Sequence, residues 1–340
     1  LMERIEGTGL DERYNFKGVR RGRKSGVLCH VTSLPSPYGI GTLGQASRNF
    51  IDYLLLCGQS VWQILPLGVT GFGNSPYQSF SNKAGNPYLI DLDGLVEEGL
   101  LARDLLSSFD FGGDPQRVDY GLLWQNRRRL LRLAFDAFIS DGHDGLQEAF
   151  NHFKASEDAS WLHAYALFMT IKSSEGGRPF WLWPDPLKLR DEDHLETFSQ
   201  AHWEDLEFEK FLQFFFFRQW GQIRDYASRA GIEIIGDIPI YVAEDSVEVW
   251  QEPHLFQLDE DLRPVFVAGC PPDYFSDTGQ LWGNPLYDWP AHEEEGFRWW
   301  IDRLSFQMRL YDTIRIDHFR GLESYWSIPY GEETARRGHW

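Results

Sequence analysis

Short β-branched runs alternate with longer stretches of helical spacing along this chain. The runs at 26–31, 61–65 and 232–240 are apolar enough to be buried strands, and the first two lead into turn-rich loops. Between these two runs, apolar residues recur at the spacing of an amphipathic helix over 45–57. The order strand, helix, strand predicts a parallel βαβ unit.

A long section separates the second run from the third. From about 91 to 229 the apolar spacing is helical, which favours an insertion over barrel wall. After the third run, the pattern predicts a long loop, a helix and a final strand that leads directly into Asp317. The expected segments are helices at 122–138, 161–171, 207–227 and 294–311, and a loop from about 243 to 290.

The final strand is expected to place the Asp317 carboxylate at the rim of the sheet. Alternation along the strand places Arg315 and Asp317 on one face and His318 on the other. A guanidinium beside a carboxylate favours the ionised form, so Asp317 is expected to be an anion that can act as a nucleophile. A structural ion pair at a strand end would explain the same residues equally well.

Asp237 lies near the end of the 232–240 run, so two strands each present a carboxylate before a loop. In a (β/α)₈ barrel that end of the sheet is the active face. Two carboxylates about 5 Å apart suit retaining glycoside chemistry, in which one is the nucleophile and the other the acid. Asp237 could be the acid or an orienting group; the alternative is a strand-end cap that binds loop N–H groups.

Composition narrows the class of ligand. The chain has 32 Lys and Arg against 51 Asp and Glu, a net charge of −19, which opposes binding to nucleic acid or to an anionic membrane. Aromatic residues make up 16% of the chain, and several lie in Gly/Pro-rich loops, where flat rings can stack on sugars. A neutral carbohydrate fits both observations.

Two loops contain aromatic residues of this kind. The segments 71–80 and 271–287 mix rigid Pro and Gly with aromatic, amide and hydroxyl side chains, as a sugar-binding groove requires. The first follows the second strand and is expected to reach the same rim. Compact surface loops packed on their own aromatics are the alternative.

Other functions lack their motifs. The segment 39–44 matches G-x-G-x-x-G, but no acidic residue follows at the end of the next strand, so a dinucleotide site is disfavoured. The sequence contains no nucleophile elbow, no phosphate-binding P-loop and no H-E-x-x-H helix.

The cysteines and the chain ends indicate a compartment. Cys29, Cys57 and Cys270 are widely separated and odd in number, which argues against a disulfide framework. Residues 1–24 are polar and charged, and no later run is long enough to cross a bilayer. We expect a cytoplasmic protein. The chain starts with Leu1 and stops at Trp340 without a polar tail, so truncation at both ends is expected.

Five segments, at 26–44, 61–90, 232–250, 267–287 and 314–326, together resemble the 4-alpha-glucanotransferase family of the alpha-amylase clan, whose members are also called amylomaltase or disproportionating enzyme. The likeness runs through nearly the whole chain and is carried by SPYQSFS, GDIPI, PPDYFS, WGNPLY and RIDHFRG. It implies an α/β fold, a (β/α)₈ TIM-type barrel with mostly helical insertions. On this view 1–25 is a tail, 26–340 is roughly the first half of the barrel, and the insertion spans about 91–229.

The resemblance also implies an activity. Family members transfer α-1,4-glucan segments from a donor chain to an acceptor sugar and need no metal or organic cofactor, so the expected partners are α-1,4-glucans and maltooligosaccharides. By the same likeness Asp317 forms the covalent glucosyl intermediate, flanked by Arg315 and His318, and Asp237 holds the sugar at the cleavage point. The further substrate contacts are Tyr77 and Ser75 on the donor side, and Tyr274, Phe275, Ser276, Gly279 and Trp282 in a mobile loop.

One departure from the family pattern is important. The family's acid/base Glu and its transition-state-stabilising Asp lie in segments resembling AEDLG and HDN, and neither segment occurs in 1–340. The acid/base Glu is therefore expected beyond Trp340, and the isolated chain is expected to be poorly stable and inactive. The alternatives are a retaining α-glucan hydrolase or, if the chain end is natural, a non-catalytic carbohydrate-binding protein.

Overall fold

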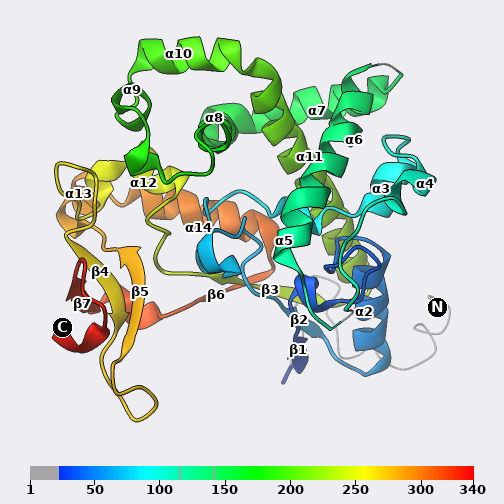
Figure 1. The fold of residues 1–340 in the computed structure, drawn as a ribbon. Coiled ribbons are helices and arrows are strands. Elements are labelled where there is room, and N and C mark those ends of the chain that lie inside the picture. The colour runs from blue at the N-terminus through cyan, green and yellow to red at the C-terminus, as the bar shows by residue number, and fades with distance from the viewer. Residues whose placement is uncertain (1–22, 115, 141) are drawn as a thin grey trace.

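Two sheets of different kinds organise the chain, with helices gathered beside them (Figure 1). The computed structural model describes residues 23–114, 116–140 and 142–340, so most of the expected tail at 1–25 lies outside the described residues. In Figure 1 one sheet crosses the lower middle of the molecule, and the other forms a yellow-to-red arm that also carries the C-terminus.

The first sheet has four parallel strands in the order β1-β2-β3-β6. Helix α2 (Gln45–Leu56) connects the first two strands, which confirms the predicted βαβ unit. The first three strands are shorter than the runs at 26–31, 61–65 and 232–240 that predicted them. Within the described residues, β1 and β6 each pair with one neighbour. The strands are β1 (Gly26–Leu28), β2 (Val61–Gln63), β3 (Glu233–Ile238) and β6 (Thr313–Ile316).

The second sheet corrects the loop expected at 243–290. It is antiparallel, in the order β5-β4-β7, and β4 and β5 form a hairpin inside that segment. Gly and Pro in the segment indicated a loop, but Gly269 is needed for pairing, since a Cβ there would lie 2.2 Å from the Gln280 carbonyl oxygen. The strands of this sheet are β4 (Phe266–Cys270), β5 (Gln280–Pro285) and β7 (Trp326–Pro329). The segment expected to be a loop also contains the short helix α12 (Val247–Gln251).

Helices dominate 91–229, as the apolar spacing predicted. The expected helix at 207–227 is confirmed as the longer α11 (Trp203–Arg229), which contacts both α2 and β3. The others in this section are α3 (Leu92–Glu97), α4 (Arg103–Leu106), α5 (Tyr120–Leu122), α6 (Arg128–Ser140), α7 (Asp144–Glu157), α8 (His163–Ser174), α9 (Asp185–Lys188) and α10 (Glu192–Ala201).

The helix expected at 294–311 is confirmed over 298–310, and a separate short helix precedes it. Helix α13 (Trp289–Glu294) ends before Gly296 and Phe297, which both have positive φ. The right-handed helix cannot continue through that conformation, so α14 (Arg298–Leu310) starts afterwards. Helix α14 then leads into β6 and packs against it.

Aromatic side chains fill two cores. One lies between the parallel sheet and α2, α6 and α11 and includes Trp62, Phe215 and Trp220. The other lies under the hairpin and includes Trp250 and Tyr287. Much of the aromatic content therefore stabilises the fold by burial, at about 25 cal/mol for each Å² of apolar surface removed from water.

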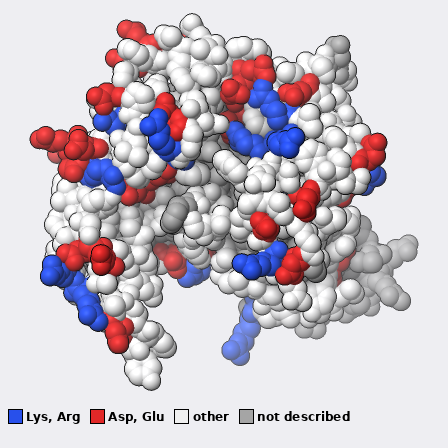
Figure 2. All heavy atoms as spheres, in the orientation of Figure 1, with Lys and Arg blue, Asp and Glu red and all other residues white. Residues whose placement is uncertain are grey.

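Charged residues of both signs are interspersed on the face shown in Figure 2. Among the described residues, no helix combines the length and apolar character needed to span a bilayer.

Candidate active site

The ends of β3 and β6 bring two carboxylates to one guanidinium. The strand register places Arg315 opposite Asp237. Arg315 Nη1 donates to both carboxylate oxygens of Asp237, at 2.7 and 2.8 Å, and Nη2 donates to Asp317 Oδ1 at 2.5 Å. The predicted Arg315–Asp317 contact is confirmed. The two-pronged contact with Asp237 was not predicted, because only the sheet register reveals it.

The two carboxylates differ in exposure. The side chain of Asp237 is 1% exposed and that of Asp317 is 39% exposed. Tyr77 Oη also donates to Asp237 Oδ2 at 2.8 Å, and burial together with this bond raises the pKa of Tyr77. Asp237 is thus buried and held by Arg315 and Tyr77, whereas Asp317 presents a carboxylate that a ligand can reach. An accessible anion fixed by a guanidinium has the chemistry of a nucleophile.

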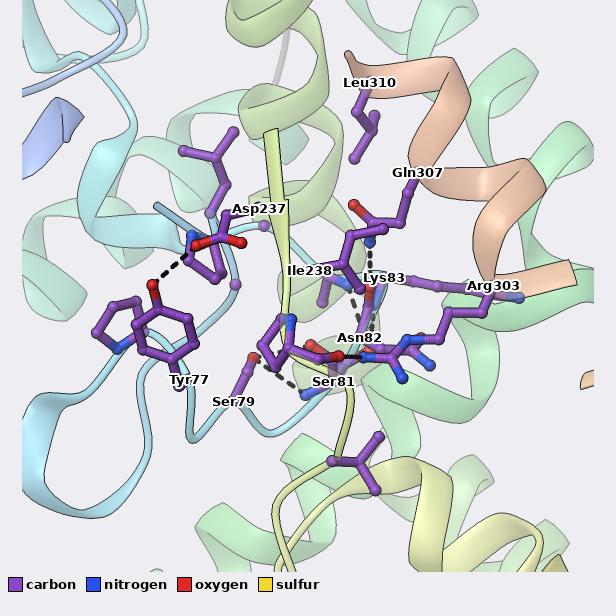
Figure 3. Close-up of a pocket in the computed structure, with 18 of the residues that line it drawn as sticks. Tyr77, Ser79, Ser81, Asn82, Lys83, Asp237, Ile238, Arg303, Gln307 and Leu310 are labelled. Carbon is purple, nitrogen blue, oxygen red and sulfur yellow. Dashed lines mark hydrogen bonds between the residues drawn. The ribbon is translucent and has the colours of Figure 1, made fainter. Parts of the chain in front are cut away.

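A small cavity lies behind Asp237 (Figure 3). Its volume of about 50 Å³ has room for one or two waters and not for a sugar ring, so a ligand would lie on the open side, by Asp317. Tyr77 and Asp237 meet at one end of this view, and α14 supplies Arg303 and Gln307 at the other.

Helix α14 holds the two segments that carry Asp237 and Tyr77. Arg303 donates to the carbonyls of Pro239 and Ile240, just after β3. Gln307 donates to the carbonyl of Asn82, in the loop that follows Tyr77. Both segments are therefore fixed to one rigid helix, which preorganises the hydrogen bond between Tyr77 and Asp237.

His318 departs from the alternation expected along the strand. Strand β6 ends at Ile316, and His318 has a left-handed backbone with φ of 51°. Its ring meets the edge of Trp282 at a centroid distance of 5.0 Å, and burial lowers its pKa. The turn directly after the strand, and not the strand pleat, orients His318.

The hairpin between β4 and β5 carries the other expected contacts. Asp273 accepts hydrogen bonds from the backbone N–H groups of Phe275 and Ser276. Gly279 has φ of +70° and no space for a Cβ, which would lie 2.4 Å from the Cys270 carbonyl oxygen. The turn is therefore well defined, although the side chains at its tip are free: Tyr274 is 96% exposed and Phe275 92% exposed.

The two predicted aromatic loops meet. Gln78 Nε2 donates to the Trp282 carbonyl and to Asn284 Oδ1, each at 3.1 Å. Together with the bond from Tyr77 to Asp237, this agrees with the expectation that the 71–80 loop reaches the rim. Ser75 Oγ accepts from the Tyr77 N–H at 3.3 Å and so shapes that turn. Sequence reasoning missed Gln78, and the string SPYQ that contains it was the available signal.

No group of three or more potential metal-ligating side chains occurs within 23–114, 116–140 and 142–340. His30, two residues after β1, is buried, and desolvation lowers its pKa to about 4. It is therefore a neutral core residue.

The parallel sheet with carboxylates at its strand ends, next to an aromatic hairpin, is typical of carbohydrate-active α/β enzymes. The chain belongs to the 4-alpha-glucanotransferase family, whose model matches residues 29–340.

Similar proteins agree with this assignment. A 4-alpha-glucanotransferase of Thermus thermophilus is 51% identical over 318 residues, which are 94% of this chain and 62% of that protein. One from Streptococcus pneumoniae is 48% identical over 319 residues, again 94% and 62%. The structure of the amylomaltase of Streptococcus agalactiae in complex with acarbose matches with a TM-score of 0.90 and 44% identity, covering 94% of this chain and 64% of that one. The chain thus spans somewhat under two thirds of the length of these relatives.

Proposed function

We propose that the protein carrying this chain transfers α-1,4-glucan segments to an acceptor sugar by a retaining double displacement. The observation that carries the proposal is the Arg315 bridge between a buried Asp237 and an accessible Asp317. The family assignment supports the same reaction.

In the first step, a carboxylate oxygen of Asp317 attacks the anomeric carbon of the donor sugar. The bond to the leaving glucan oxygen breaks, and that oxygen takes a proton from a general acid. A glucosyl ester of Asp317 results. In the second step, a hydroxyl of the acceptor attacks the same carbon, gives its proton to the conjugate base, and releases the Asp317 carboxylate.

The surrounding residues have distinct roles in this scheme. Arg315 orients Asp317, and His318 contacts the reacting sugar beside the nucleophile. Asp237 belongs to the site of the same sugar and supports it through Arg315 and Tyr77, since its side chain is 1% exposed and its oxygens are bonded to these two residues. Tyr77 and Ser75 line the donor side. The residues that close over the glucose units are Tyr274, Phe275, Ser276, Gly279 and Trp282.

We assign the general acid/base to a Glu on a segment resembling AEDLG, beyond residue 340. In the same proposal, β1, β2, β3 and β6 are strands of a (β/α)₈ barrel, and 91–229 is largely an insertion. These four strands are parallel, and among the described residues β1 and β6 each pair with one neighbour only. Both facts support a place for the four strands within a larger barrel. The negative net charge of −19 suits neutral α-glucans as substrates. The three widely separated cysteines suit a cytoplasmic location.

The choice between transfer and hydrolysis depends on water at the second step. Exposed Tyr274 and Phe275 can cover an acceptor sugar and exclude water from the Asp317 ester, which favours transfer. On maltotriose, transfer gives glucose and longer chains. Hydrolysis gives glucose and maltose without elongation.

The test compares Asp317→Ala with the unaltered protein, in a polypeptide extended to the length of its relatives. Disproportionation of maltotriose should fall by about 10⁴-fold or more, as expected for loss of a nucleophile. The matched control is Asp136→Ala, which removes a half-exposed carboxylate paired with Arg132 on α6. Turnover that survives Asp317→Ala would refute the proposal.

A further inference from the structure

Glu248 is a buried acidic side chain that the proposed reaction does not use. It lies in the first turn of α12 and is 7% exposed. Its Oε1 accepts hydrogen bonds from the Ser81 hydroxyl at 3.1 Å and from the Asn82 N–H at 2.7 Å, whereas Oε2 has no partner among the described residues. Removing a carboxylate from water is costly to a fold, so its place beneath these two residues requires an explanation.

This carboxylate binds the segment that follows Tyr77. The Phe80 carbonyl accepts from the Val247 N–H at 2.9 Å, at the start of α12. The Asn82 carbonyl accepts from the Gln307 side chain of α14 at 2.5 Å (Figure 3). The segment is therefore held from two sides, by α12 and by α14.

Helix α12 links this segment to the strand that carries Asp237. The chain passes from β3 through one loop into α12, and the N-cap Ser246 fixes that loop by donating to the Ala243 carbonyl at 2.7 Å. Asp237 and Tyr77 thus come from two separate segments, and Glu248 joins them. The 2.8 Å hydrogen bond from Tyr77 to Asp237 depends on the relative position of these segments.

We propose that Glu248 is a positioning residue that keeps the Tyr77 hydroxyl against Asp237. It acts through the backbone of Asn82 and the hydroxyl of Ser81, which fix the end of the loop that carries Tyr77. In one respect the inference rests on the proposed function, in which Tyr77 and Asp237 belong to the site of the reacting sugar. A displacement of about 1 Å in such a site can lower a rate by about 10²-fold.

The geometry uses Glu248 as an acceptor rather than as a charge. Both donors converge on Oε1, which accepts in the carboxylate and as the carbonyl oxygen of the neutral acid. Burial raises the pKa of Glu248, and the hydrogen bonds from Asn82 and Ser81 and the charge of Arg303 oppose this rise. A glutamine amide offers the same acceptor without the charge, so it separates the two roles.

The test compares Glu248→Met, which fills a similar volume without an acceptor, with Glu248→Gln, in protein extended to the length of its relatives. The readout is the ¹³Cζ NMR signal of Tyr77 in tyrosine-labelled protein, which responds to the hydrogen bond of the hydroxyl and is identified with Tyr77→Phe. In Glu248→Met the signal should move toward the position of a solvent-exposed tyrosine. In Glu248→Gln it should stay in place.

Asp91→Ala is the matched control. Asp91 is also a buried carboxylate that accepts from one hydroxyl, that of Thr42, and from one backbone N–H, that of Gly94. These contacts lie at the start of α3 and not at the rim, so the Tyr77 signal should not change in this variant.

Two results of the NMR comparison would overturn the proposal. One is a Tyr77 signal that stays in place in Glu248→Met, and the other is a signal that moves as far in Glu248→Gln. If Glu248→Met fails to fold, hydrogen exchange at the Asn82 N–H of the unaltered protein decides. Strong protection supports the proposal, and exchange as rapid as in an exposed loop overturns it.

Kinetics distinguish positioning from a general loss of folded protein. Glu248→Met should lower kcat/KM for maltotriose about tenfold and Tyr77→Phe about fivefold. Because Glu248 acts through Tyr77, the double variant should match Glu248→Met within about twofold. A double variant that shows the product of the two losses would contradict the proposal. If Asp317→Ala leaves turnover intact, the proposed function fails, while the NMR result for Tyr77 still stands.

Discussion

The rim of the parallel sheet and the tip of the β4–β5 hairpin, which the proposed function assigns to the same sugar, are built in opposite ways. At the rim, Asp237 is 1% exposed and is held by Arg315 and Tyr77. At the tip, Tyr274 and Phe275 are almost fully exposed and their rings contact each other.

The difference follows from the kind of interaction each region makes. A buried carboxylate is stable only when its hydrogen bonds are already in place, because desolvated charge is costly. Aromatic stacking has no such requirement, since the rings can gain their contacts when a ligand arrives. Charged chemistry is therefore preorganised in the sheet, and apolar contact is left to the hairpin.

The largest expected effect concerns His30, buried directly after β1. Its pKa in the folded protein is about 4, below the value of about 6.5 in an unfolded chain. Between these values the unfolded state binds more protons, so stability is lost as pH falls from about 6.5 through 4, by about 3 kcal/mol. Urea unfolding at several pH values should show that the free energy of unfolding depends less steeply on pH in His30→Gln than in the unaltered protein. Equal slopes in both proteins would contradict the burial argument.

Arg315→Met should have the next largest effect on stability. It leaves the buried Asp237 with only Tyr77 as a partner and should lower the free energy of unfolding by about 2 kcal/mol, below the usual cost of a broken buried pair because Arg315 is itself 45% exposed. Arg103→Met, at an exposed pair with Asp93, is the control and should change nothing measurable. Equal effects would mean that the rim is an ordinary surface ion pair.

Tyr77→Phe should cost about 1 kcal/mol, because one hydrogen bond to a buried carboxylate is lost while Arg315 remains. Denaturant titration of this variant and of Tyr53→Phe, at an exposed ring, measures the difference. A loss as large as that of Arg315→Met would show that the tyrosine, and not the guanidinium, is the main support of Asp237.

The double change Tyr274→Ala and Phe275→Ala should have the smallest effect on stability, with an unchanged unfolding midpoint, since both rings lie in solvent. Maltooligosaccharide affinity should nevertheless fall on the order of tenfold. Calorimetric titration against Trp203→Ala, an exposed ring elsewhere, tests this. A lower midpoint without loss of affinity would reverse the comparison between rim and tip.

Local pattern was a good guide wherever one element could be recognised alone. The four parallel strands, α2 and α11 lie where apolar spacing placed them. Apolar spacing did not predict the hairpin, because β4 and β5 are strands only by virtue of the pairing of β4 with β5 and with β7. The later start of α14, at Arg298 and not at 294, escaped notice because a positive φ at Phe297 leaves no mark in composition.

By itself, the sequence determined that strands end in Asp237 and Asp317, that Arg315 lies beside Asp317, and that aromatic loops follow, because period and motif are local properties of a chain. Only the tertiary structure decided that Arg315 also binds Asp237, and that Asp237 is buried whereas Asp317 is accessible. Those outcomes depend on register and burial, which arise when distant segments pack together and fix which polar atoms lose water.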